Sequence, residues 1–234
     1  MGEAGPYTDA MPARHCRPIG SHISLVGALL LAMSSCSRDS LPPTKPLPQS
    51  STPAATQTAL LFGKPPPGMT RIAFVCDDSG SMLTSSSTLK RELVRSIDSL
   101  PPDHSFGIFF MLSTTCTKFA PALASATAEN KGRAHEFVED RFGAPGETDA
   151  VPALEAAFSQ KPQLIYLLTD GDFPDNLPVL HRLRELNADH RVVVNTVAFV
   201  RKDIATRSFL DFMRQVASEN GGMLRHVDPD EIDP

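Results

Sequence analysis

Oxygen-bearing side chains are concentrated in the pentapeptide DDSGS at residues 77–81. Asp77, Ser79 and Ser81 supply one carboxylate and two hydroxyls at alternate positions of this short segment. Such oxygens are the hard ligands that Mg²⁺ and Mn²⁺ prefer in proteins. A tight loop would turn several of them toward one point, so the pentapeptide indicates a divalent-metal site. The alternative, for the pentapeptide alone, is that its Asp and Ser residues cap the start of a helix.

Two further oxygen-bearing residues, Thr148 and Asp170, stand at comparable positions farther along the chain. Thr148 lies in GETD, at the start of an expected helix, and Asp170 lies in TDG, at the end of an expected strand. The pentapeptide itself directly follows residues 71–76, RIAFVC, a continuous apolar run that predicts a strand buried on both faces. Ligands of parallel sheets bind at the carboxyl ends of the strands. We therefore expect the three segments to meet at one edge of a sheet.

Strand-like and helix-like segments alternate from residue 71 onward. We expect strands at residues 71–76, 105–112, 117–120, 163–169, 191–200 and 223–227, and helices at residues 89–100, 127–141, 149–158, 175–186 and 206–219. Thr127 is expected to cap a helix, and Asn220-Gly221-Gly222 to end the last one. The alternation predicts an α/β fold: a doubly wound, Rossmann-like, mostly parallel six-stranded sheet with helices on both faces. The strand at 117–120 follows a tight turn and is expected to be a short antiparallel edge strand.

The residue types, their order and their elements resemble the metal ion-dependent adhesion site of the von Willebrand factor A family. The motif of that family is Asp-x-Ser-x-Ser, then a Thr, then an Asp followed by Gly, and it is matched here by Asp77, Ser79, Ser81, Thr148 and Asp170. The resemblance covers residues 71–227 and implies the von Willebrand factor A fold. It also implies a bound Mg²⁺, with Mn²⁺ or Ca²⁺ as substitutes. By resemblance, Ser79 and Ser81 bind the ion directly, and the other three residues bind it directly or through water.

The same resemblance implies a binding role for the ion. One coordination position would stay open for an Asp or Glu carboxylate of a protein partner. A divalent ion with only two nearby carboxylates, and neutral hydroxyls otherwise, stays electrophilic enough to attract a third carboxylate. We expect residues 82–88 and the loops around Gly146 and Asp172 to form the rim of this site.

The first part of the chain predicts export and a spacer. Residues 23–33, ISLVGALLLAM, are too short to span a bilayer and have the length and flanks of a signal-peptide core; a start at Met11 would give a leader of ordinary length. The following MSSC resembles the lipobox of bacterial lipoproteins, which implies lipidation of Cys36, whereas the alternative is ordinary secretion. Residues 37–69 are rich in Pro, Ser and Thr and predict an extended linker. The resulting division is residues 1–36 as leader, 37–69 as linker and 70–234 as domain.

Several function classes lack support in the sequence. A net charge of −5 and a pI near 5.8 give no basic footprint for nucleic acid. The chain has no GxSxG, P-loop or HExxH motif, and its cysteines form no CxxC spacing. We expect Cys76 and Cys116 to be free thiols, although a disulfide between them is open in an oxidising compartment.

The leading functional hypothesis is an adhesion-type binding module, not an enzyme. It would be exported to the cell envelope, anchored to the membrane through a lipid on Cys36, and would bind a protein partner through its metal ion. One alternative is a scaffold or assembly subunit that uses the same fold without metal-dependent binding. Another is a metal-dependent hydrolase.

Overall fold

The computed structural model describes residues 60–112, 114–141, 148–171 and 173–232. The expected leader, the lipidation site Cys36, and the rim positions Gly146 and Asp172 lie outside these residues. Within the described residues, no helix combines the length and apolarity needed to cross a membrane.

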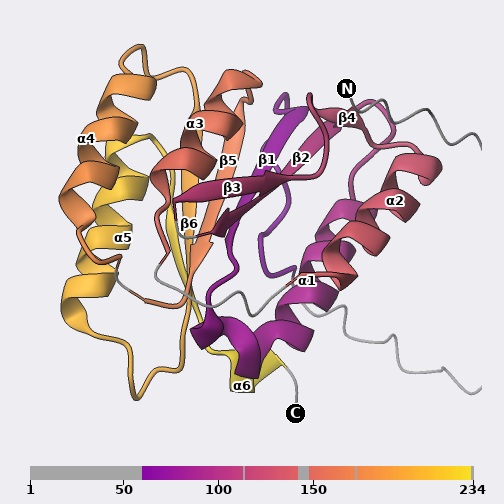
Figure 1. Ribbon diagram of the computed structural model, residues 1–234. Coiled ribbons are helices and arrows are strands. Elements are labelled where there is room, and N and C mark those ends of the chain that lie inside the picture. The colour runs from indigo at the N-terminus through magenta and orange to yellow at the C-terminus, as the bar shows by residue number, and fades with distance from the viewer. Residues whose placement is uncertain (1–59, 113, 142–147, 172, 233–234) are drawn as a thin grey trace, which may run out of the picture. The chain divides into compact units, whose positions relative to one another are not determined.

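A single sheet organises the domain, with strand order β3-β2-β1-β5-β6-β7 (Figure 1). Strands β1, β2, β5, β6 and β7 pair in parallel, and β3 is an antiparallel edge strand on β2, as the sequence predicts. The strands are β1 Arg71–Asp77, β2 Ser105–Leu112, β3 Thr115–Lys118, β4 Ala124–Ser125, β5 Leu164–Thr169, β6 Val193–Phe199 and β7 Leu224–Val227. The predicted number of six strands is wrong: β4 pairs with β2 and makes the sheet seven-stranded. A strand of two residues is too short to show an alternating or continuous apolar pattern in the sequence.

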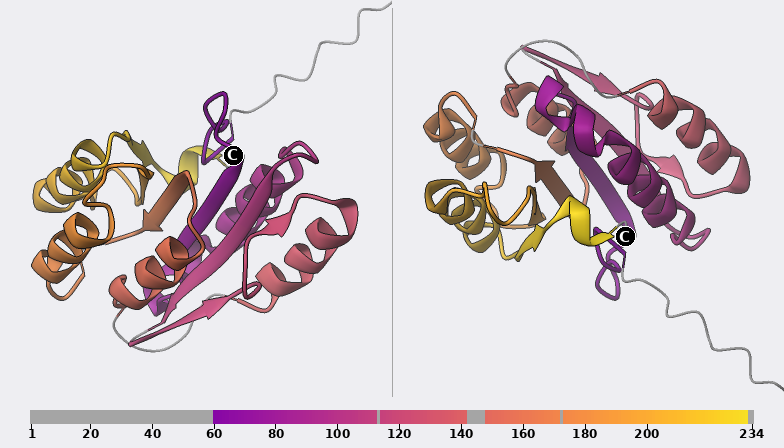
Figure 2. Two further views of the ribbon diagram at one scale, coloured as in Figure 1. Left: turned by 90° about the horizontal axis from the view of Figure 1, so that it is seen from above. Right: turned by 90° about the horizontal axis from the view of Figure 1, so that it is seen from below.

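Helices cover both faces of the sheet, which confirms the doubly wound prediction (Figures 1 and 2). Helices α1 and α2 pack in one buried apolar cluster, and α3, α4 and α5 pack in a second cluster on the other face. The helices are η1 Gly80–Ser85, of 3-10 type, α1 Ser86–Asp98, α2 Ala128–Glu139, α3 Val151–Ser159, α4 Asn176–Leu186, α5 Arg207–Glu219 and α6 Pro229–Ile232. The sequence did not predict η1 or α6. Both are too short to show a repeating pattern of apolar residues.

Side-chain caps begin several of the helices, and glycine follows the end of α5. The side chain of Thr127 accepts a hydrogen bond from the Asn130 N–H at the start of α2, as predicted. Gly221, which follows α5, has a φ of +66°, a conformation that favours glycine. A Cβ on Gly222 would lie 2.0 Å from the carbonyl oxygen of Val194, so this position requires glycine for the close approach to β6.

The buried core begins earlier in the chain than the predicted boundary at residue 70. Leu61 and Phe62 are buried, and the Phe62 ring makes edge-to-face contacts with Phe74 and Tyr166 at centroid distances of 5.1 and 5.5 Å. The Leu61 N–H also donates to the carboxylate of Glu92 on α1. Leu61 and Phe62 fall within the expected linker 37–69, yet they pack against the core of the domain. The prolines around them give no signal of this contact in the sequence.

Parallel pairing brings the ends of the strands together. Asp77 pairs with Met111, and Cys76 pairs with Leu168, so β1, β2 and β5 end side by side. The segments that follow β1 and β5 therefore leave the sheet at the same edge.

Candidate metal centre

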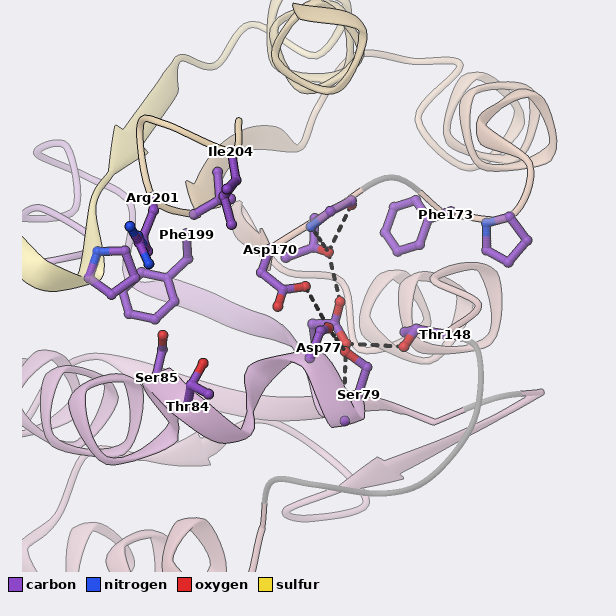
Figure 3. Close-up of a pocket in the computed structure, with 17 residues that line it drawn as sticks. Asp77, Ser79, Thr84, Ser85, Thr148, Asp170, Phe173, Phe199, Arg201 and Ile204 are labelled. Carbon is purple, nitrogen blue, oxygen red and sulfur yellow. Dashed lines mark hydrogen bonds between the residues drawn. The ribbon is translucent and has the colours of Figure 1, made fainter. Parts of the chain in front are cut away.

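A pocket of about 700 Å³ opens at the carboxyl ends of the parallel strands (Figure 3). It is lined by every residue of the predicted ligand set: Asp77, Ser79, Ser81, Thr148 and Asp170. Asp77 ends β1, the two serines lie at the start of η1, Thr148 lies shortly before α3, and Asp170 follows β5. The structure thus brings together residues that are up to 93 positions apart in the chain.

Asp77 is buried beneath the pocket and held by hydrogen bonds from separate segments. Its side chain is only 3% exposed. Oδ1 accepts from the Ser79 N–H at 2.9 Å and from the Thr148 hydroxyl at 3.1 Å. Oδ2 accepts from the Thr169 hydroxyl at 2.7 Å. The orientation of this carboxylate is therefore fixed by the protein itself.

A second chain of hydrogen bonds runs along the open side of the pocket. The Ser81 hydroxyl donates to Oδ1 of Asp170 at 3.0 Å, and the Ser79 and Ser81 hydroxyl oxygens lie 2.8 Å apart. Since a serine hydroxyl has one proton, Ser79 must be the donor to Ser81. Both hydroxyl oxygens keep lone pairs that a cation would use.

The charges of the pocket favour a cation. Burial and, after it, the nearby charge of Asp77 raise the pKa of Asp170 to about 6, although hydrogen bonds from Ser81 and the backbone oppose the rise. A positive ion that entered between Asp77 and Asp170 would offset this repulsion and stabilise the ionised form of Asp170.

The donor set fits a hard divalent ion. In the part of the chain that the structure describes, no three His, Cys, Asp or Glu side chains gather closely enough to hold a metal. A centre at this pocket therefore depends on hydroxyl oxygens as well as on Asp77 and Asp170. Carboxylate and hydroxyl oxygens without nitrogen or sulfur suit Mg²⁺, Mn²⁺ or Ca²⁺ rather than Zn²⁺.

Two features of the site were missed from the sequence. Thr169 fixes Asp77 from the end of β5, and nothing in its type distinguishes it from an ordinary strand residue; its place directly before Asp170 was the only signal. The pocket also extends toward the loop after β6, where Val200, Arg201 and Ile204 line it, and toward Pro229 at the start of α6. Of the predicted rim, Thr84 and Ser85 line the pocket, and so do Gly171, Phe173 and Pro174 of the loop around position 172.

The two described cysteines are free thiols, as expected. Cys76 lies on β1 beside the site and is fully buried, and burial raises the pKa of its thiol far above the ordinary value. Burial also raises the pKa of Cys116, to about 11. Both groups therefore stay protonated near neutral pH, which makes them poor nucleophiles and poor metal ligands.

The chain is similar to known proteins in sequence and in fold. No protein-family model matches the chain. The sequence is 30% identical over 193 residues to human inter-alpha-trypsin inhibitor heavy chain H4, a match that covers 70% of this chain but only 19% of the length of that relative.

Among solved structures, the VWA domain of SpRpn10 superposes with a TM-score of 0.51 at 10% identity, covering 69% of this chain and 89% of that domain. The human COPII-coat protein Sec24c gives a TM-score of 0.45 at 13% identity, covering 71% of this chain and 30% of that protein. The superposition on a solved VWA domain and the doubly wound order of the strands identify the fold of this chain as that of a von Willebrand factor A domain.

Proposed function

We propose that this chain is a protein-binding module that captures a carboxylate of its partner through a divalent ion, Mg²⁺ or alternatively Mn²⁺ or Ca²⁺. The ion would be held by Asp77, Ser79, Ser81, Thr148 and Asp170. The observation that carries the proposal is the convergence of these oxygens on one open pocket, joined by hydrogen bonds.

The two carboxylates have different roles in this proposal. Both oxygens of Asp77 already accept hydrogen bonds, and the side chain is buried. Asp77 therefore acts mainly by orienting the hydroxyls around it and by supplying negative charge. Ser79, Ser81 and Asp170 line the open side, so their oxygens are the ones that an entering ion reaches first.

The bound ion would supply an electrophile for the partner. The hydroxyl ligands are neutral, so the ion keeps affinity for a further carboxylate. The pocket opens to solvent at the edge of the sheet, which leaves room for an Asp or Glu side chain of another protein (Figure 3). Fold alone does not define a function, and the proposal rests on these side chains.

Export and anchoring form a separate part of the proposal. The apolar run at residues 23–33 and the following Cys36 support a lipid-anchored module in the cell envelope, with secretion as the alternative. Residues 37 to about 59 would act as the spacer that holds the domain away from the membrane. Mass spectrometry of the mature protein from its native host tests this part: a diacylglyceryl group on Cys36 supports the anchor, and an unmodified N-terminus contradicts it.

The binding function is tested with a minimal acidic ligand. The full-length chain is titrated with the blocked peptide Gly-Gly-Asp-Gly-Gly in Mg²⁺ and in EDTA, and binding is followed by NMR chemical shifts. We expect millimolar binding in Mg²⁺, loss of binding in EDTA, and no binding of the counterpart with Asn in place of Asp.

Matched variants distinguish the site from a general charge effect. Asp170→Asn is expected to abolish binding of the peptide, whereas Asp189→Asn, which removes an exposed carboxylate in the turn between α4 and β6, is expected to leave it unchanged. Binding that survives EDTA and Asp170→Asn would contradict the proposal and favour a scaffold that binds through another surface.

A further inference from the structure

The pocket is larger than the metal centre needs. Beyond Asp170 it continues between the end of η1 and the loop that joins β6 to α5 (Figure 3). This second part is lined by Thr84, Ser85, Val200, Arg201, Ile204 and Pro229. Two regions of different chemistry therefore share one cavity.

Hydrogen bonds and ion pairs hold the loop that forms the outer wall. The N–H groups of Ile204 and Ala205 donate to the Arg201 carbonyl at 3.2 and 3.0 Å, which closes a turn. The Lys202 N–H donates to the Asp228 carboxylate at 3.0 Å. The Lys202 ammonium pairs with Glu231 of α6. The wall is thus fastened to the segment that follows β7.

Arg201, the cation that lines this wall, is already paired with carboxylates. The guanidinium of Arg201 lies 2.8 Å from the carboxylate of Asp203 and 3.5 Å from that of Asp230. A third carboxylate from a ligand would have to compete with both, so Arg201 is a poor anchor for an additional acidic group. The chemistry that the wall offers to a ligand is therefore mainly apolar.

Ile204 presents that apolar surface to solvent. Its side chain is 62% exposed, while Phe199, Val200 and Pro229 behind it are buried. One exposed Ile is ordinary on a protein surface. This one, however, lines the same cavity as the candidate metal ligands (Figure 3).

We propose that Val200, Ile204 and Pro229 form a second subsite, which takes an apolar side chain adjacent in sequence to the acidic residue of the partner. The inference rests on the proposed function, because the carboxylate on the ion would bring its neighbour against this wall. The recognised chemistry is then an acidic residue beside Leu, Ile, Val, Met or Phe in an extended segment of a protein. Burial of such a side chain adds affinity in proportion to the apolar area that leaves water.

The test compares blocked pentapeptides on the full-length chain in Mg²⁺. The probes are Gly-Gly-Asp-Gly-Gly, Gly-Gly-Asp-Leu-Gly and Gly-Leu-Asp-Gly-Gly, with affinities measured by NMR titration. We expect one of the two Leu peptides to bind about tenfold more tightly than the all-Gly peptide, since partial burial of one Leu corresponds to roughly that factor. EDTA should remove the binding of all of them.

Two variants test whether Ile204 carries the preference. Ile204→Ala should bring the Leu peptide to within about twofold of the all-Gly peptide, because it removes most of the apolar wall that Leu would contact. Met223→Ala is the matched control. Met223 is 75% exposed and precedes β7, so it lies at the amino ends of the parallel strands, away from the pocket at their carboxyl ends. The preference for Leu should therefore persist in this variant. Both positions are exposed, and neither variant is expected to unfold the chain.

The outcomes separate the two proposals. Equal affinity of the Leu and Gly peptides in Mg²⁺, or a preference for Leu that survives Ile204→Ala, overturns the apolar subsite and leaves the metal-dependent function standing. If no peptide binds in Mg²⁺, or if binding is the same in EDTA, the proposed function fails and the subsite fails with it.

Discussion

At the level of single residues, Asp77 shows how the chain prepares its site. The carboxylate is buried, which is unfavourable unless its oxygens are hydrogen-bonded. Its donors come from three places: the backbone of Ser79, Thr148 before α3, and Thr169 at the end of β5. Because these donors are far apart in the sequence, the carboxylate is oriented only when the whole domain has folded.

Thr169 provides a direct test of this account. Thr169→Val keeps the shape of the side chain but removes the 2.7 Å hydrogen bond to Asp77. Loss of a hydrogen-bond donor to this buried carboxylate should lower the free energy of unfolding by about 1–3 kcal/mol. Urea unfolding in EDTA measures the effect without any contribution from a metal ion.

The control for this measurement is Thr115→Val. Thr115 is exposed on the edge strand β3, so its substitution should change the free energy of unfolding by less than about 0.5 kcal/mol. Equal effects of the two substitutions would show that Thr169 does not support Asp77.

At the level of elements, two buried asparagines join the ends of helices. Asn187 follows α4, and its amide donates to the Val192 carbonyl at 2.8 Å and to the Asn220 side chain at 2.7 Å. Its side-chain oxygen accepts from the Val192 N–H at 3.0 Å, and Asn220 in turn donates to the Val216 carbonyl. This network ties the ends of α4 and α5 to the start of β6.

Removal of Asn187 should therefore loosen both helix ends. Asn187→Ala leaves buried backbone groups without partners, and we expect a loss of about 1–3 kcal/mol in the free energy of unfolding, measured in urea. Asp189→Ala, an exposed change in the same turn, should cost less than about 0.5 kcal/mol. A loss at position 187 no larger than that of the control would refute a structural role for the network.

The segment before β1 is the second feature at this scale. Phe62 is 4% exposed and packs on Phe74 and Tyr166. Phe62→Ala should cost about 3–5 kcal/mol in the free energy of unfolding, as other buried Phe truncations do. Urea unfolding beside the exposed Lys64→Ala variant checks this; a cost below about 1 kcal/mol would restore the view that the segment belongs to the linker.

At the level of the whole molecule, the sequence predicted the sheet and helices because long buried runs have clear periods. Buried strands such as β5 are continuous apolar runs in the sequence, and α5 places its apolar residues on one face. The packing of Phe62 was not predictable from the sequence, because its partners Phe74 and Tyr166 lie next to each other only in the folded chain. The same holds for Thr169 and for the wall around Ile204, since each acquires its role from a neighbour distant in sequence.

The expected sheet topology predicted the position of the candidate site better than any single motif did. The proposed metal ligands lie at and just after the end of β1, before α3 and after β5, and parallel pairing brings the ends of β1 and β5 together. The residue types singled out five side chains, and all five line the same pocket. The extent of the pocket toward α6 came from a loop whose sequence carries no signal of binding.

The proposed site requires that the folded chain bind a divalent ion at the carboxyl ends of the parallel strands. Calorimetric titration of Mg²⁺ and Mn²⁺ into the full-length chain tests it directly, beside the variant Ser79→Ala/Ser81→Ala. This variant keeps the buried Asp77 carboxylate and thereby separates loss of ligands from loss of folding. Thermal melts in the same buffers report the linked change in stability.

We expect saturable one-to-one binding to the wild type and none to the variant. At an ion concentration of about 100 times Kd, the free energy of unfolding of the wild type should rise by about 2.7 kcal/mol. No heat of binding and an unchanged melting temperature of the wild type at millimolar Mg²⁺ and Mn²⁺ would contradict the account.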